Sequence, residues 1–315
     1  MHHYLPRFYL RGFCDPEISK RENRSAIWVY EKDKPVRRGS PDKEARERDF
    51  YAFNESGASN TEVEDWFAAL EGKVAATFPH VHDQHVMLTS DEKECLAEFI
   101  GTMLLRTPAG RNWHEKRVGP AVSEYLAEAA ANPQAFARML QSEGLPIEPL
   151  QNVEGARQEI LGGRHEALAK LPGLNLAAMV DVGRMIAGKL LELNWQVVHS
   201  EGAEFFITAD SPVVTEMRDD LKGLTYFWMG VDREGVNVWF PISSTVCLRM
   251  KRGIDSGRCQ LRERGVRMVN KNLMLCAHHV IYAAERSQEL SNLFNTLGCM
   301  SSLESSEMTW QGRKF

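Results

Sequence analysis

Apolar side chains recur at helical spacing through the middle of the chain, between about residues 60 and 194. Two successive stripes each follow a Ser or Thr with a Glu three residues later, the spacing of a capping box, and the second stripe ends before Pro108. A third apolar face runs from about Asn175 to Asn194, and the stretch 112–170 predicts several short helices. The caps and stripes are Ser59 and Glu62 with Val63, Trp66, Phe67, Leu70, Val74 and Phe78, and Thr89 and Glu92 with Leu96, Phe99, Ile100, Met103 and Leu104.

Short β-branched and aromatic runs flank this helical block on both sides and predict strands. Two lie near the N-terminus, at 26–30 and 49–53, and are joined by a charged loop. The others follow residue 194, where Gly, Asp and Pro signals separate short strands from two further helices. These later elements are strands at 195–198, 204–208, 236–240, 245–248 and 280–282 and helices at 264–276 and 287–297.

The order of these elements predicts an α+β fold with a mainly antiparallel sheet built from N-terminal and C-terminal segments. The large helical block of about 60–194 is inserted between the sheet segments, and residues 1–300 are expected to form a single domain. Residues 301–315 are polar and are expected to form a loose tail.

The first thirteen residues carry a high density of rings and apolar side chains, at Pro6, Phe8, Tyr9, Leu10 and Phe13. Chain ends usually fray unless packing holds them. A frayed tail would expose these apolar side chains to water, so the segment is expected to pack into the core. Such packing would bury, wholly or in part, the neighbouring polar side chains, which are His3, Tyr4, Arg7 and Arg11.

Composition and charge indicate a globular protein and argue against duplex DNA binding and membrane insertion. The chain has 315 residues, 43% of them hydrophobic, which is enough for a substantial core. A net charge of −5 with scattered basic residues gives no broad positive surface for duplex DNA. The six cysteines form no Cys-x-x-Cys pair, as expected of reduced thiols, and no apolar run approaches the ~18 residues of a membrane span. We therefore expect a cytoplasmic protein that does not enter a membrane.

Two stretches of the chain follow recognisable patterns. Residues 3–13 read His-Tyr-Leu-Pro-Arg-Phe-Tyr-Leu-Arg-Gly-Phe, which resembles the His-Tyr-x-Pro-x-Phe-x-Leu-Arg-x-Phe opening of the mostly bacterial domain-of-unknown-function family 4238. Residues 206–213 resemble the family's Phe-Ile-Thr-Ser-Asp-Asn-Pro-Val pattern, from which Ala209 and Ser211 depart. Shorter agreements occur at 28–30, Glu71, 105–108, Trp195, 240–243 and Asn270. The family is defined by sequence, so the resemblance implies membership and no particular reaction.

Arg106 lies three residues after Met103, on the apolar face at the end of the second predicted helix. A cation that faces a core needs a partner, because an unpaired buried charge is costly. Glu71 sits at the edge of the preceding helix's stripe, so the two side chains are predicted to meet across an antiparallel helix pair. The pair would be either a buried ion pair that fixes helix register or a pair that faces a substrate.

Asp210 and His3 each have two or more interpretations. Asp210 follows an apolar strand and precedes Ser211 and Pro212, a position that suits both a site carboxylate and a side chain that stabilises a turn. His3 could act as a general acid or base, as a metal ligand, or as a core histidine bonded to backbone carbonyls.

One shared cluster would satisfy these polar groups more readily than separate buried sites. Arg and His side chains suit phosphate or carboxylate groups, and acidic side chains suit proton transfer or a divalent metal ion. The catalytic candidates are His3, Glu71 and Asp210, and the binding candidates are Tyr4, Arg11, Arg106 and Asn270.

This cluster leads to two functional hypotheses. The first is a phosphodiesterase or nuclease-like hydrolase, in a toxin or phage-defence setting, that acts on a nucleotide or single-stranded RNA, since the chain lacks the many cations that a long duplex requires. The second is a non-catalytic module that senses a small ligand or binds a partner protein, with the cluster as a structural network. An open cleft shared by His3, Arg106 and Asp210 would favour the first, and full burial with every hydrogen bond satisfied would favour the second.

Three histidines lie close together at His80, His82 and His85. Their spacing resembles the His-x-His-x-Asp-His signature of the metallo-β-lactamase fold, but the aspartate and the spacer are exchanged. Because the stretch falls between two predicted helices, we expect an exposed loop and not the active site. The chain also lacks the Walker, Gly-x-Gly-x-x-Gly, Gly-x-Ser-x-Gly and His-Glu-x-x-His motifs.

Overall fold

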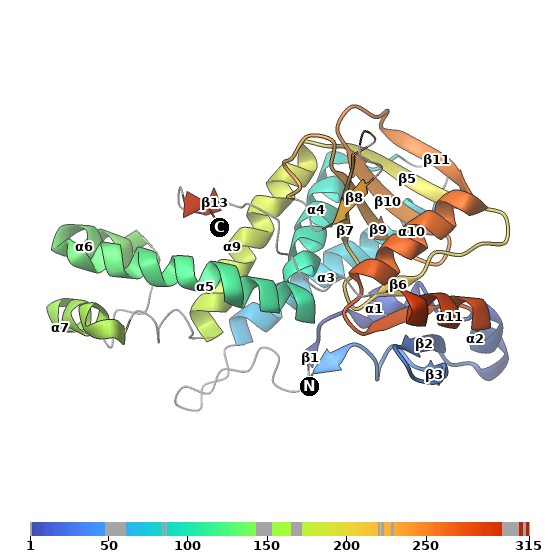
Figure 1. Cartoon of the computed structure of the whole chain (residues 1–315), viewed down its shortest axis with the longest axis horizontal. Coiled ribbons are helices and arrows are strands. Elements are labelled where there is room, and N and C mark those ends of the chain that lie inside the picture. Colours follow the sequence, from blue (N-terminus) through green and yellow to red (C-terminus); the bar gives the residue numbers. More distant parts are fainter. Residues whose placement is uncertain are drawn as a thin grey trace.

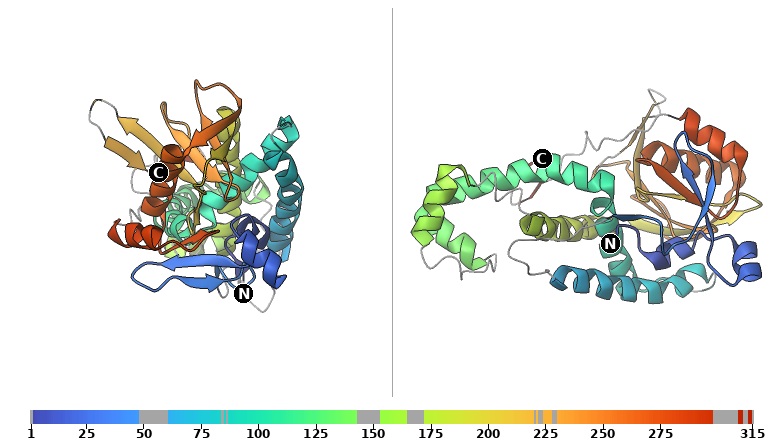
Figure 2. Two further views of the ribbon diagram at one scale, coloured as in Figure 1. Left: turned by 90° about the vertical axis from the view of Figure 1, so that its right-hand side faces the viewer. Right: turned by 90° about the horizontal axis from the view of Figure 1, so that it is seen from below.

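The computed structural model describes residues 2–47, 61–83, 85, 87–142, 153–164, 172–219, 221, 224–227, 230–297, 309–310 and 313–314. Within them, helices and two main β-sheets make an α+β fold, as the sequence predicted. Figures 1 and 2 show the sheets at one end of the molecule and helices α5, α6 and α7 extending away from them. The helical block consists of α3 (Thr61–His82), α4 (Ser90–Leu105), α5 (Pro108–Ala131), α6 (Pro133–Ser142), α7 (Val153–Glu159), the π-helix η1 (Ile160–Arg164) and α9 (Pro172–Leu191).

A six-stranded sheet follows the helical block, with strand order β11-β5-β10-β9-β7-β8. Neighbouring strands are antiparallel except for β11, which runs parallel to β5. Side chains alternate between two cores: Val238 and Phe240 belong to the core shared with the helical block, and Trp239 to the core shared with α10. The elements are β5 (Asn194–Glu201), β7 (Val214–Asp219), β8 (Leu224–Phe227), β9 (Asn237–Pro241), β10 (Val246–Lys251), β11 (Gly257–Arg262) and α10 (Glu263–Cys276).

A four-stranded antiparallel sheet joins the two ends of the chain, in the order β3-β2-β12-β6. Its elements are β2 (Ile27–Glu31) and β3 (Arg37–Gly39) from the N-terminal part and β6 (Thr208–Ala209) and β12 (Val280–Ala283), followed by α11 (Gln288–Thr296), from the C-terminal part. The prediction that N-terminal and C-terminal segments build a common sheet is confirmed. The second sheet, made of C-terminal strands alone, was not separated from it in the sequence.

The N-terminal segment packs into the core, as its composition predicted. It comprises β1 (His2–His3), paired with β4 (Arg46–Glu47), and the short helices α1 (Arg7–Arg11) and α2 (Pro16–Glu22). The Tyr9 hydroxyl hydrogen-bonds Thr208 Oγ1 at 2.6 Å, and the Tyr9 ring stacks on Phe240 with 5.3 Å between centroids. Four side chains of the segment are fully buried: Leu5, Tyr9, Leu10 and Phe13.

The strand partner of β2 differs from the expected one. β2 pairs with β3, which lies inside the stretch that was expected to be a charged loop, whereas the predicted strand 49–53 falls outside the described residues. Asp33, with a φ of 58°, makes the tight turn between β2 and β3. Because β3 is a short edge strand with exposed arginines, it lacks the apolar alternation on which the strand prediction relied.

The predicted strand 204–208 is also shorter than expected, since only Thr208 and Ala209 pair as β6. The Asn270 side chain takes the place of a neighbouring strand: its Oδ1 accepts from Ile207 N at 3.1 Å and its Nδ2 donates to Phe205 O at 2.7 Å. Strands β7 and β11 were missed because they are half polar and lie at or near a sheet edge.

Helix α4 begins at its predicted cap. Thr89 and Glu92 form both bonds of the capping box at the start of α4, while Ser59 falls outside the described residues. Pro108 follows the end of α4 and also begins α5, where Thr107 Oγ1 accepts from Gly110 N at 3.2 Å. In the part of the chain that the structure describes, no helix is both long and apolar enough to span a bilayer.

Helices α4 and α9 pack most closely where two glycines meet. A Cβ placed on Gly101 would lie 2.3 Å from the Gly183 carbonyl oxygen, whereas a Cβ placed on Gly183 would lie 3.5 Å from Thr102, an ordinary contact. The close approach therefore requires glycine at position 101 and not at position 183.

Gly101→Ala is expected to lower the free energy of unfolding by ~1–3 kcal/mol, because the added methyl group forces two helix backbones apart. Gly183→Ala is the matched control and should be neutral or stabilising by up to ~1 kcal/mol, since alanine favours helix. Urea unfolding of both variants measures the difference. Equal effects at the two positions would show that α4 and α9 are not in this close contact.

Candidate functional site

The predicted contact between Arg106 and Glu71 is present. Arg106 Nη1 donates to Glu71 Oε1 at 2.7 Å, and Arg106 Nη2 donates to the backbone oxygen of His3 at 2.6 Å. The guanidinium also lies 4.7 Å from the centroid of the Phe67 ring. The Arg106 side chain is 3% exposed and that of Glu71 is 26% exposed, so the pair lies at the edge of the core. Arg106 thereby connects α3, α4 and the N-terminal strand.

His3 is half-buried beside this pair. Its Nδ1–H donates to the backbone oxygen of Glu44 at 3.1 Å. Burial, followed by the nearby charge of Arg7, lowers the pKa of the His3 imidazole below its usual value. Burial therefore favours the neutral ring, and its contact with Glu44 is the one expected of a histidine bonded to a backbone carbonyl.

Tyr4 extends the cluster toward the four-stranded sheet. Its side chain hydrogen-bonds that of Tyr282, which is 1% exposed and lies on β12. Burial raises the pKa of Tyr282 well above its usual value, and Tyr4 and the charge of Asp210 raise it further. Tyr282 thus lies between the N-terminal segment and Asp210.

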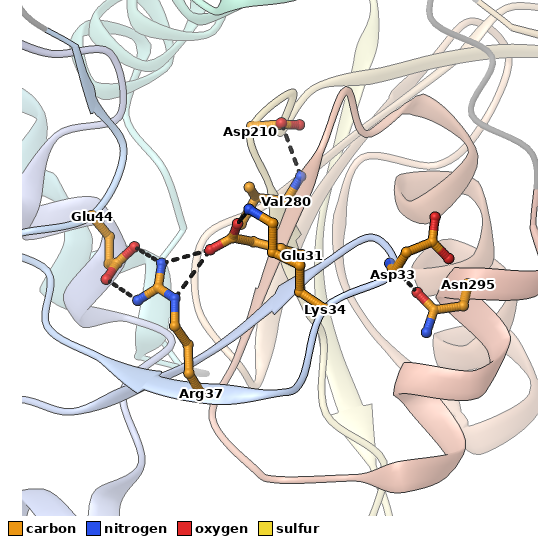
Figure 3. A network of polar contacts seen from close by, with 8 residues as sticks. All are labelled: Glu31, Asp33, Lys34, Arg37, Glu44, Asp210, Val280 and Asn295. Atoms are coloured by element: carbon orange, nitrogen blue, oxygen red, sulfur yellow. Dashed lines mark hydrogen bonds and ion pairs between the residues drawn. The ribbon is translucent and has the colours of Figure 1, made fainter.

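Asp210 is buried and its carboxylate is occupied by backbone donors. It accepts hydrogen bonds from His278 N at 2.7 Å and His279 N at 2.6 Å, and its own N–H donates to Val280 O at 2.9 Å. It also accepts from Val280 N at 3.0 Å (Figure 3). Burial raises the pKa of Asp210 to about 6, against the lowering effect of these three bonds. The carboxylate holds the distant connection between α10 and β12 in place, whereas the turn interpretation had placed its bonds in the turn at Ser211 and Pro212.

An ion-pair network missed in the sequence borders this region. Arg37 bonds Glu31 through Nε and Nη2 at 3.0 and 2.9 Å, and bonds Glu44 through Nη1 and Nη2 at 2.6 and 2.8 Å (Figure 3). These contacts hold β2, β3 and the following loop together. The residues were assigned to a solvated loop because charge alone does not distinguish a paired edge strand from a loop.

Two predicted binding residues lie apart from the cluster. The Arg11 side chain is 58% exposed and sits 3.9 Å from Asp42, so the expected burial of Arg11 is wrong; Arg7, at 60%, is likewise exposed. Both project from α1 away from its buried side, which carries Tyr9 and Leu10. Asn270 bonds the backbone of residues 205–207, as described above, and borders a separate pocket.

This pocket has a volume of about 260 Å³ and lies between α10, α11 and two connecting segments. Residues 203–207 form one side, residues 283–287 form another, and the facing sides of the two helices complete it. Its walls combine apolar side chains with polar and charged ones in similar proportion. The lining residues are Ala203, Glu204, Phe205, Ile207, Arg267, Asn270, Met274, Ala283, Ala284, Glu285, Ser287, Glu289, Leu290 and Leu293.

A second buried carboxylate escaped the sequence analysis. Glu216 Oε1 accepts from Asn237 Nδ2 at 3.0 Å and from Trp239 Nε1 at 2.9 Å, and Asn272 donates to Glu216 Oε2. Glu216 shares its sheet face with Val214, two residues earlier, so the period of the strand could have revealed its inward position.

The histidine stretch is exposed, as expected, but only part of it is a loop. His80 and His82 lie in the last turn of α3, and His85 follows the helix. His80 Nδ1 contacts Glu92, and His82 Nδ1–H donates to Phe78 O at 2.7 Å. Among the described residues, no group of three or more His, Cys, Asp or Glu side chains is arranged to hold a metal ion.

The sequence matches a known protein family. The family model described as protein of unknown function (DUF4238) matches residues 1–287. The chain belongs to the DUF4238 family. Neither a curated protein nor a solved structure matches it. In this DUF4238 protein, the two stretches that carry the resemblance meet in space, since the Tyr9 hydroxyl hydrogen-bonds Thr208 Oγ1.

Arg106→Met is expected to lower the free energy of unfolding by ~3 kcal/mol, because it leaves Glu71 and the His3 carbonyl without their hydrogen-bond donor. Glu71→Gln should cost less, since Glu71 is partly exposed. The double variant should cost at least ~1 kcal/mol less than the sum of the two, because no buried charge is then left alone. Denaturant unfolding of the four proteins gives this coupling energy.

The exposed pair of Arg184 and Glu98, 3.2 Å apart, serves as the control for that cycle, with an expected coupling below ~1 kcal/mol. Strictly additive effects of Arg106→Met and Glu71→Gln would contradict the buried contact.

Proposed function

We propose that this DUF4238 protein is a non-catalytic module that binds a small ligand in the pocket between α10 and α11. The observation that carries the proposal is the pocket itself, whose volume of about 260 Å³ is close to the lower end of the ~300–1,000 Å³ of small-molecule sites. Small-molecule sites pair apolar surface with placed polar groups, and the lining here contains both.

Hydrogen bonds to the backbone of the two connecting segments fix the walls of the pocket, which supports a preformed site. The buried Tyr30 hydroxyl donates to Glu285 O at 2.6 Å and accepts from Ser287 N at 2.8 Å, so it fixes one wall. Asn270 fixes the opposite wall through its two bonds to the backbone of Phe205 and Ile207. A site fixed in this way loses little entropy when a ligand binds.

Phosphodiester hydrolysis by His3, Glu71 and Asp210, with a nucleotide or single-stranded RNA as substrate, is the less favoured proposal. Asp210 and Arg106 are 2% and 3% exposed, and their polar groups bond to other groups of the protein. This is the arrangement expected of a structural network and not of an open cleft.

Ala203→Phe tests the site, because Ala203 is exposed at the pocket and a phenyl ring there should fill it without disturbing the core. Fragments that bind the parent protein, detected by ligand-observed NMR, should lose their signal with this variant. They should keep it with Ala68→Phe, a matched change on the exposed side of α3.

Fragment binding that is insensitive to Ala203→Phe, or a complete absence of binders, would contradict the proposed site. Turnover of a phosphodiester that His3→Gln abolishes would instead support the hydrolase.

A further inference from the structure

We infer that the α10–α11 pocket takes a small organic cation, an ammonium group attached to a compact apolar body. The inference rests on the proposed binding function and specifies the chemical class of its ligand. It follows from the charges at the pocket, from their pairing, and from the apolar surface beside them.

Carboxylates outnumber cations at the pocket. Its lining contains Glu204, Glu285 and Glu289 against one cation, Arg267. Arg267 is already paired, because its Nε donates to Glu204 Oε1 at 2.6 Å. Glu204 first, and then Glu263 and Glu289, raise the pKa of Arg267, as expected in a negative local field. An anionic ligand would have to displace Glu204 from Arg267.

Two carboxylates remain for a ligand. Within the described residues, neither Glu285 nor Glu289 has a cation within 4.0 Å or a side-chain hydrogen bond. Both residues are exposed and line the pocket. A ligand ammonium group at this position would meet unpaired negative charge at no cost in broken protein contacts.

The start of α11 does not reverse this preference. A helix N-terminus favours anions, but Ser287 Oγ already accepts from Leu290 N at 3.1 Å. Glu289, in the first turn, supplies negative charge at the same helix end. The end of the helix is therefore satisfied by the chain's own groups.

The remaining walls suit an apolar body and not a bare metal ion. Ile207 and Met274 are buried, and Phe205 is half-buried and offers a ring for contact with a cation. Leu293, at 38% exposure, extends the apolar surface to the outside. A hydrated inorganic cation would gain nothing from these side chains, whereas an amine with an attached ring or short alkyl group contacts both parts of the pocket.

Three probes of one skeleton test the charge preference: 2-phenylethylamine, 2-phenylethanol and 3-phenylpropionate. Their binding to the full chain at pH 7 is measured by isothermal titration calorimetry. We expect the amine to bind at least tenfold more tightly than the alcohol, and the carboxylate to bind more weakly than both. Amine binding should weaken as ionic strength rises, while alcohol binding should not.

Glu285→Gln and Glu289→Gln should each weaken amine binding several-fold and leave alcohol binding unchanged. Glu17→Gln removes the same charge from an exposed position on α2 and should alter neither. Thermal unfolding of each variant at the parent temperature establishes that the fold is retained.

The outcomes separate the inference from the proposed function. Binding of the alcohol or the carboxylate as tightly as the amine, lost with Ala203→Phe, would overturn the cation preference and leave the binding module in place. Failure of all three probes at millimolar concentration would also overturn the cation inference, and the fragment screen with Ala203→Phe then decides the binding function on its own.

Discussion

The fold depends on the docking of residues 2–13 between the helical block and the two sheets. Tyr9 is fully buried and bonds Thr208, which joins α1 to the four-stranded sheet, while its ring stacks on Phe240 of the six-stranded sheet. At the other end of the segment, the His3 carbonyl receives a hydrogen bond from Arg106 at the end of α4. One short segment therefore contacts the helical block and both main sheets, through hydrogen bonds as well as apolar packing.

This docking changes how the polar residues of the family pattern are understood. His3, Tyr4, Arg106 and Asp210 are polar, partly or fully buried and brought together from distant parts of the chain, as a catalytic cluster would be. Their bonds, however, go mainly to backbone groups of neighbouring segments. Groups that satisfy one another in this way stabilise a fold.

Features that depend on residues close together in the sequence, such as helix starts and helix faces, were predictable. The capping box of Thr89 and Glu92 predicted the start of α4. The positions of Arg106 and Glu71 beside apolar stripes predicted their contact, because the helical period fixes which side chains share a face. Strand β3 and the short β6 could not be predicted in the same way. The ion pair of Arg37 with Glu44 supports β3, and the Asn270 side chain replaces a strand partner beside β6, and neither contact is visible in the local sequence pattern. The pocket is less predictable still, because residues 203–207, 267–274 and 283–293 meet there only after α10 and α11 have packed.

Removal of residues 1–13 is the decisive test of this docking. If these residues hold the sheets and the helical block together, the shortened protein will lose cooperative thermal unfolding or melt well below the full chain when both are followed by circular dichroism at pH 7. A shortened protein that unfolds cooperatively at the temperature of the full chain would show that the segment is dispensable and would contradict the account.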